Sequence, residues 1–106
     1  MLRDMIAGIL VDEGQIVLIA SDAREAMQRL SNHEVDLLIT DITMPGGMDG
    51  FQLARTAKRM RPNLHVIYIS GQYSPQARDA GPIFGPIIQK PIHFAALLEE
   101  IGRIVA

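Results

Sequence analysis

The chain has 106 residues, a net charge of −2 and no cysteine, and 48% of its residues are apolar. This length suits one domain spanning residues 1–106, and the charge excludes a general attraction to nucleic acid or to an anionic membrane. The lack of cysteine excludes disulfides and thiolate metal sites. Because there is also no signal-like block or membrane-spanning run, we expect a soluble cytoplasmic domain.

The first part of the chain predicts a helix, a strand and a second helix. Apolar residues at helical spacing predict an amphipathic helix over residues 2–12, which Gly14 would end. Residues 15–20, QIVLIA, read as a short buried strand. Asp22 is expected to cap the next helix, with Glu25 completing a capping box.

A second aliphatic strand over residues 35–40 leads directly to Asp41. The helix predicted over residues 51–60 would end at Pro62, which cannot continue it. Its basic residues are expected on the outer, solvated face, namely Arg55, Lys58, Arg59 and Arg61.

The last part of the chain predicts two more strands and a final helix. Residues 65–70, HVIYIS, form the third strand. Residues 71–86 are rich in glycine and proline and leave room for little more than one helical turn near residues 75–79. A short strand follows at residues 87–89, and the final helix covers residues 94–105.

This alternation of helices and strands predicts an α/β fold with an open parallel sheet covered by helices on both faces. In such sheets the chemistry lies beyond the carboxyl ends of the strands. Asp41, Ser70 and Lys90 each lie at or just after one of those ends. A carboxylate held there can bind a hard cation or accept a phosphoryl group, whose oxygens a hydroxyl and an ammonium can contact.

Three motifs in this order, LLITDITMPGGMDG, VIYISG and KP, resemble the receiver domain of two-component response regulators, the CheY-like family. The resemblance covers nearly the whole chain and implies a flavodoxin-like fold. It also implies that Asp41 is the phosphoacceptor, Ser70 the switch hydroxyl and Lys90 the phosphate-binding lysine.

The resemblance further implies Mg²⁺ as a cofactor, held in part by Asp41 and by the backbone carbonyl of Thr43. A cis peptide bond is implied between Lys90 and Pro91. The loop after the second strand would be shaped by Pro45, Gly46, Gly47 and Gly50.

The acidic pair that holds Mg²⁺ in this family has no counterpart here. Asp12 and Glu13 are not that pair, because only one strand and one helix separate them from Asp41, where the family has a helix, a strand and a helix. The first family strand and its acids are therefore expected to be absent, and Mg²⁺ binding to be weak. Ile87 also replaces an aromatic residue that the family usually places three positions before the lysine, and the fourth family helix is expected to be short or broken.

In the family the absent strand lies within the sheet, beside the strand that bears the phosphoacceptor. Three explanations are open. The natural chain can begin upstream, residues 15–20 can pair directly with residues 35–40, or a second copy can fill the gap. The last two predict a homo-oligomer.

The leading hypothesis is a receiver, not an enzyme, that accepts a phosphoryl group on Asp41 from a histidine kinase or a histidine phosphotransfer protein. The alternative is a receiver-like binding or dimerisation module that works without phosphate and has a defective Mg²⁺ site. A third option is another small flavodoxin-like domain with a catalytic carboxylate. No nucleic acid or membrane partner is expected.

Overall fold

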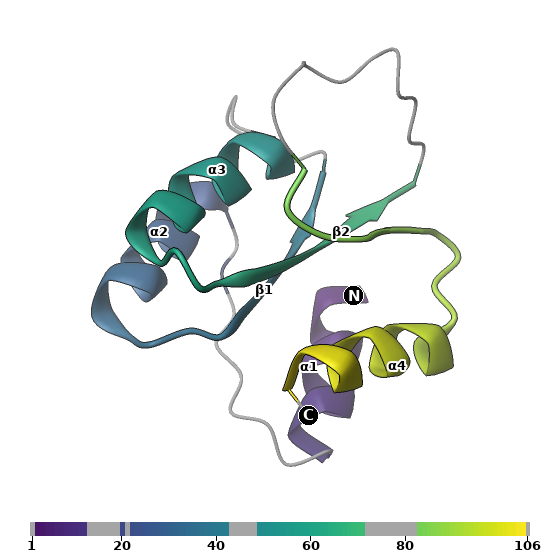
Figure 1. Cartoon of the computed structure of the whole chain (residues 1–106). Coiled ribbons are helices and arrows are strands. Elements are labelled where there is room, and N and C mark those ends of the chain that lie inside the picture. Colours follow the sequence, from purple (N-terminus) through teal and green to yellow (C-terminus); the bar gives the residue numbers. More distant parts are fainter. Residues whose placement is uncertain (1, 13–19, 21, 43–48, 72–82, 106) are drawn as a thin grey trace.

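The computed structural model describes residues 2–12, 20, 22–42, 49–71 and 83–105. These residues form four helices and three strands (Figure 1). In chain order they are α1 (Leu2–Asp12), α2 (Ala23–Asn32), β1 (Leu37–Asp41), α3 (Gly50–Met60), β2 (His65–Ser70), β3 (Ile87–Gln89) and α4 (Phe94–Val105).

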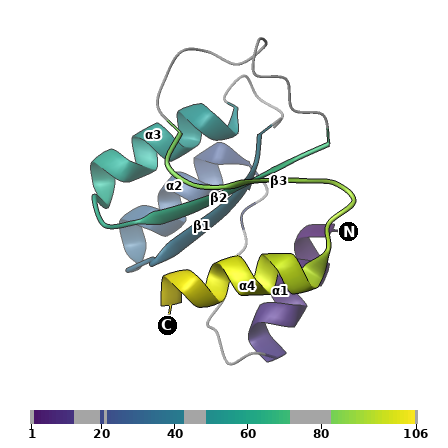
Figure 2. The ribbon, with the colours of Figure 1, turned by 45° about the vertical axis from the view of Figure 1, so that its right-hand side comes forward.

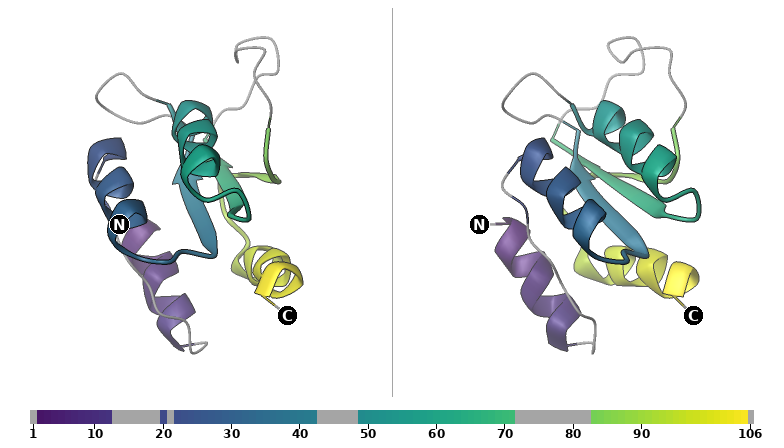
Figure 3. Two further views of the ribbon diagram at one scale, coloured as in Figure 1. Left: turned by 60° about the vertical axis from the view of Figure 1, so that its left-hand side comes forward. Right: turned by 90° about the vertical axis from the view of Figure 1, so that its left-hand side faces the viewer.

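The three strands form one open parallel sheet in the order β1-β2-β3, which confirms the predicted fold class. Helices α2 and α3 lie over one face, and α1 and α4 lie on the other (Figures 2 and 3). Asp41 is paired with Ile69, and Ser70 with Gln89. The carboxyl ends of all three strands therefore meet at one rim of the sheet.

The core consists of two hydrophobic layers separated by β2. Alternate residues of β2 point to opposite faces, so Val66 and Tyr68 pack with α2 and α3 while Ile67 and Ile69 pack with α1 and α4. From Val66 onward every residue of β2 is buried. Burial on both faces explains why HVIYIS reads as an almost continuous apolar run.

Short side chains fix the start of two helices. The carboxylate of Asp22 accepts the N–H of Glu25 at 2.8 Å, as expected for the cap of α2. A reciprocal capping box, which the sequence reading missed, joins Asp49 and Gln52 at the start of α3. Such a cap stabilises a helix by about 1 kcal/mol.

Two of the basic residues assigned to a solvated face of α3 are not free on it, and that expectation was wrong. The ammonium of Lys58 donates to the carbonyls of Pro62 and Leu64, at 2.8 and 2.9 Å. The guanidinium of Arg61 donates to the carbonyls of Leu30 and His33, at 2.9 and 3.2 Å. These cations satisfy carbonyls near the ends of α3 and α2, where helices leave acceptors unpaired.

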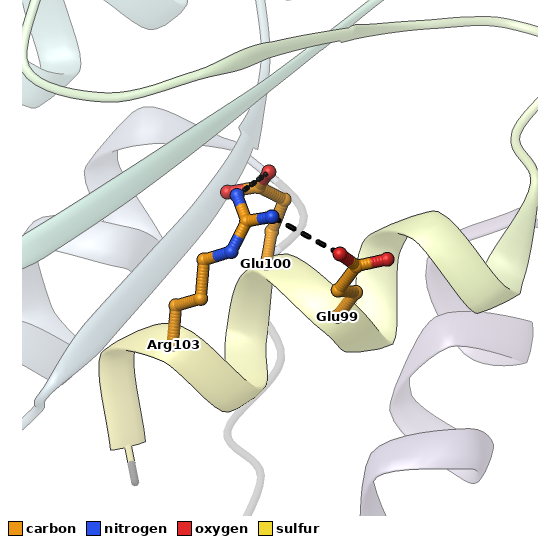
Figure 4. Close-up of polar contacts among 3 residues, drawn as sticks. All are labelled: Glu99, Glu100 and Arg103. Carbon is orange, nitrogen blue, oxygen red and sulfur yellow. Dashed lines mark hydrogen bonds and ion pairs between the residues drawn. The ribbon is translucent and has the colours of Figure 1, made fainter.

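The solvent side of α4 carries an ordinary charged cluster. Arg103 pairs with Glu99 at 3.0 Å and with Glu100 at 2.8 Å, one helical turn away (Figure 4). Exposed pairs at this spacing contribute a few tenths of a kcal/mol, on the order of 0.3–0.5. This cluster therefore needs no functional explanation.

The other predicted elements match with small shifts of their ends. Asp41 is the last residue of β1, and Asp12 is the last residue of α1, so Asp12 does not end a strand. The strand predicted at residues 15–20 falls almost wholly on residues outside the described part, as does the turn at residues 75–79. In the described part of the chain, no helix has the length and apolar character needed to cross a membrane.

Candidate functional site

Asp41 and Lys90 meet at the rim of the sheet, although they come from different strand ends. Asp41 ends β1, and Lys90 follows β3 directly. The Nζ of Lys90 lies 3.6 Å from Oδ1 of Asp41, and their side chains are 43% and 51% exposed. The carboxylate is therefore rigidly placed by its strand, open to solvent and in contact with a cation.

Ser70 lies on the strand between them. It ends β2 and is 5% exposed. Its carbonyl accepts the N–H of Lys90 at 2.8 Å, while the carbonyl of Ile69 accepts the N–H of Ile42 at 2.9 Å. These bonds continue the ladders past the strand ends, so Asp41, Ser70 and Lys90 share one rigid rim. The carboxylate, hydroxyl and ammonium that the sequence predicted at one edge are at that edge.

The backbone behind Asp41 is held by its neighbours. The hydroxyl of Thr40 donates to the carbonyl of Asp41 at 2.9 Å. The N–H of Gly50 donates to the carbonyl of Ile42 at 2.7 Å. A Cβ on Gly50 would overlap the carbonyl oxygen of Asp41, so only glycine allows α3 to begin this close to the strand end.

The described residues test some of the features that the family resemblance implies, and they leave others untested. The Lys90–Pro91 peptide bond is cis, as expected. Ile87 is half-buried on β3, directly opposite Tyr68. The residues assigned to the loop and to the carbonyl ligand lie outside the described residues: Thr43, Pro45, Gly46 and Gly47.

The described residues do not complete a Mg²⁺ site. No three His, Cys, Asp or Glu side chains come together among them in the way that metal ligands do. The carboxylate of Asp41 instead lies against the ammonium of Lys90. Mg²⁺ is usually held by one or two carboxylates together with waters and substrate oxygens. Asp41 is one carboxylate at this rim, and no group of three candidate ligands forms around it among the described residues.

The sequence reading missed one residue next to this rim, Tyr68. Its ring is fully buried, and its hydroxyl accepts the N–H of Phe84 at 3.1 Å. The available signal was a single tyrosine among the aliphatic residues at the centre of HVIYIS. A buried tyrosine hydroxyl usually has a hydrogen-bond partner.

Comparison with known proteins agrees with this geometry. Residues 1–102 match the family model of the response regulator receiver domain. The response regulator receiver protein CpdR of Brucella abortus is 32% identical over 108 aligned positions, covering 98% of this chain and 88% of that protein. The sensor kinase/phosphatase CqsS of Vibrio cholerae is 30% identical over a similar length, but this chain spans only 16% of it.

Solved structures give the same result for the fold. A response regulator receiver protein from Sinorhizobium medicae superimposes with a TM-score of 0.85 at 30% identity, covering 97% of this chain and 84% of that one. The receiver domain of NtrX from Brucella abortus superimposes with a TM-score of 0.82 at 30% identity, covering 98% and 89% of the two chains. The motifs, the fold and the relatives agree, and this chain belongs to the response regulator receiver domain family of two-component signalling.

Proposed function

We propose that this chain accepts a phosphoryl group on Asp41 from a phosphohistidine. The donor would be a histidine kinase or a histidine phosphotransfer protein. The observation that carries the proposal is the 3.6 Å contact between Asp41 and Lys90, with Ser70 on the strand between them.

The chemistry requires positioning and charge compensation more than covalent help from the protein. A carboxylate oxygen of Asp41 would form a bond to phosphorus as the bond between phosphorus and the histidine nitrogen breaks. The electron pair of that bond leaves with the imidazole nitrogen. Lys90 would offset negative charge on the phosphoryl oxygens, and Ser70 would donate a hydrogen bond to one of them.

Two relatives support this reading. CqsS is by its name a sensor kinase/phosphatase, and part of it is similar to this chain. TrrA of Thermotoga maritima, which shares the fold at a TM-score of 0.83 and 24% identity, was solved in complex with Mg²⁺ and BeF. A receiver fold therefore accommodates a phosphoryl mimic together with Mg²⁺. Here the phosphoryl group would shift the equilibrium of the rim and so change protein contacts, making the chain a signalling module and not an enzyme.

Incubation with a small phosphoramidate donor in the presence of Mg²⁺ tests this proposal. Mass spectrometry should detect one added phosphoryl group on the wild-type chain and none on Asp41→Asn. Asp36→Asn is the matched control, because Asp36 is an exposed carboxylate just before the opposite end of β1. Labelling that survives in Asp41→Asn contradicts the proposal.

A second candidate function is a self-associating module that needs no phosphate, and the edge of β1 favours it. The carbonyl of Asp36 and the N–H of Ile42 both bond to the β2 side. By strand alternation, the N–H and C=O groups of Leu37 and Ile39 point away from β2. No other described strand pairs with that edge, and an uncovered edge can bind a strand of another chain.

Light scattering after size exclusion tests this candidate directly. The wild-type chain should be a dimer or larger at micromolar concentration, with or without phosphoryl donor. Ile39→Pro removes an edge N–H while leaving the β1–β2 ladder intact, so it should shift the chain toward monomer. A wild-type chain that is monomeric throughout contradicts self-association.

A further inference from the structure

Tyr68 lies at the centre of the sheet, close to the proposed site. It is directly opposite Thr40 on β1 and Ile87 on β3. It stands two residues before Ser70, so the two side chains are on the same face of the sheet. Its ring is 0% exposed, and it packs against the ring of Phe51 with 5.0 Å between centroids.

Tyr68 also holds the segment of residues 83–86 at two points. Its hydroxyl accepts the N–H of Phe84 at 3.1 Å, and its own N–H donates to the carbonyl of Pro86 at 2.9 Å. Between these bonds, a Cβ on Gly85 would overlap the carbonyl oxygen of Val66. The segment therefore lies flat against the backbone of β2.

A cation fixes the same segment from the side of α3. The ammonium of Lys58 lies 5.6 Å from the centre of the Phe84 ring, within the range of a cation–π contact. Lys58 is itself held by the carbonyls of Pro62 and Leu64. The phenylalanine is thus fixed at its backbone by Tyr68 and at its ring by Lys58.

This arrangement bears on Lys90 because the segment leads straight into β3. That strand has three residues and pairs only with β2 in the described sheet. Lys90 follows at once, bonded through its N–H to the carbonyl of Ser70. So short a ladder holds register weakly by itself, and the contacts of Tyr68 supply additional anchoring immediately upstream. Ile87, opposite Tyr68, is aliphatic, so its side chain cannot form a hydrogen bond that anchors this segment.

We propose that Tyr68 is a positioning residue for Lys90, acting through its hydroxyl bond to Phe84. Anion binding at Asp41 and closure of the segment 83–86 onto β2 are then coupled. The part that concerns the anion rests on the proposed function, whereas the anchoring of Lys90 does not.

The test uses the full chain labelled with ¹⁵N and the variant Tyr68→Phe, which keeps the ring and removes only the hydroxyl. Beryllofluoride with Mg²⁺ is titrated in and followed by NMR. Loss of one ordinary hydrogen bond predicts an affinity about two- to tenfold lower. Amide hydrogen exchange should also accelerate at Phe84 and Lys90, while the amides of Leu53 and Ala54 in α3 keep their protection.

Leu30→Val is the matched control. Leu30 belongs to the same buried cluster as Tyr68 but comes from α2. This substitution lowers the stability of the cluster and leaves the hydrogen bond between Phe84 and Tyr68 in place. It should leave the beryllofluoride affinity unchanged. Any faster exchange should include Leu53 and Ala54 and not be confined to Phe84 and Lys90, because a general loss of stability acts on the whole fold.

The outcomes separate this inference from the proposed function. A Tyr68→Phe chain that binds beryllofluoride as tightly as wild type overturns the positioning role. The role is also overturned if Leu30→Val loses as much beryllofluoride affinity as Tyr68→Phe. If the wild-type chain fails to bind beryllofluoride, the proposed function fails. Amide hydrogen exchange alone then tests the positioning role of Tyr68. Faster exchange at Lys90 in Tyr68→Phe then supports the role, and unchanged exchange overturns it.

Discussion

Lys90 contacts Asp41 across the end of β2, with 3.6 Å between Nζ and Oδ1. The pair is formed by two strands that are not neighbours in the sheet, β1 and β3, with β2 between them. Since both side chains are about half exposed, solvent screens the pair, and its contribution to stability is at most about 1 kcal/mol. Stability alone therefore does not explain why these two side chains meet.

Lys90→Ala should therefore affect phosphorylation much more than folding. We expect the initial rate of phosphoryl transfer from phosphoramidate to fall by at least about tenfold, corresponding to roughly 1.4 kcal/mol of lost charge stabilisation. The free energy of unfolding in urea should change by less than about 1 kcal/mol. Arg59→Ala, which removes an exposed positive charge from α3, should change neither quantity. Equal rates for Lys90→Ala and wild type would remove Lys90 from the site.

Gly50→Ala should destabilise the chain, because the added Cβ meets the carbonyl of Asp41. We expect a loss of about 1–3 kcal/mol in the free energy of unfolding. Gly8→Ala and Gly102→Ala are controls within α1 and α4, where a Cβ meets no atom within 4 Å. These two should stabilise the chain by up to about 1 kcal/mol each, since alanine favours the helix. If all three substitutions act alike in urea denaturation, the close approach of α3 to the strand end is wrong.

Stability should fall at alkaline pH through Tyr68. Burial raises the pKa of its hydroxyl, and this outweighs the lowering by the Phe84 N–H and by the charge of Arg55. The folded chain therefore keeps a proton that the unfolded chain loses near pH 10, so the free energy of unfolding decreases as the pH rises above about 10. Below that pH, the contribution of the protonated Tyr68 hydroxyl to the free energy of unfolding is fully present.

Urea denaturation at a series of pH values from about 8 to 11 measures this effect against Tyr68→Phe. The variant cannot ionise at this position, so the stability difference between the two chains should shrink or reverse as the pH rises. Other groups that titrate in the same range, such as the lysines, cancel in the comparison. A difference that stays constant up to pH 11, roughly one unit above the ordinary tyrosine pKa, contradicts the effect.

Mg²⁺ should bind weakly to the 106-residue chain. Asp41 provides one carboxylate, and the described residues contain no group of three candidate ligands. Isothermal titration with MgCl₂ should therefore detect no site of sub-millimolar affinity. A sub-millimolar site that disappears in Asp41→Asn would show that ligands outside the described residues complete it.

The sequence predicted those features that follow from periodicity and from strand ends. The sheet, its helices and the meeting of Asp41, Ser70 and Lys90 follow from apolar runs that each end in a polar residue. The parallel topology then places those ends on one edge. Features of this kind depend on residues that are close in the sequence, so the sequence alone predicts them.

Long side chains that bond to backbone groups were not predictable in the same way. Lys58 lies in the last turn of α3 and Arg61 directly follows this helix, and nothing in their spacing shows that they reach carbonyls of other segments. The hydrogen bond from Phe84 to Tyr68 joins two segments that are separated in the sequence by a stretch rich in glycine and proline. These contacts depend on tertiary packing, which residue types alone do not specify.

An NMR titration of the ¹⁵N-labelled chain with beryllofluoride and Mg²⁺ tests most directly whether the rim at Asp41 binds a phosphoryl group. We expect saturable shifts at the amides of Asp41, Ser70 and Lys90, and their loss in Asp41→Asn. A wild-type spectrum that stays unchanged at millimolar beryllofluoride, on the order of 1–10 mM, would contradict the claim that this rim binds a phosphoryl group.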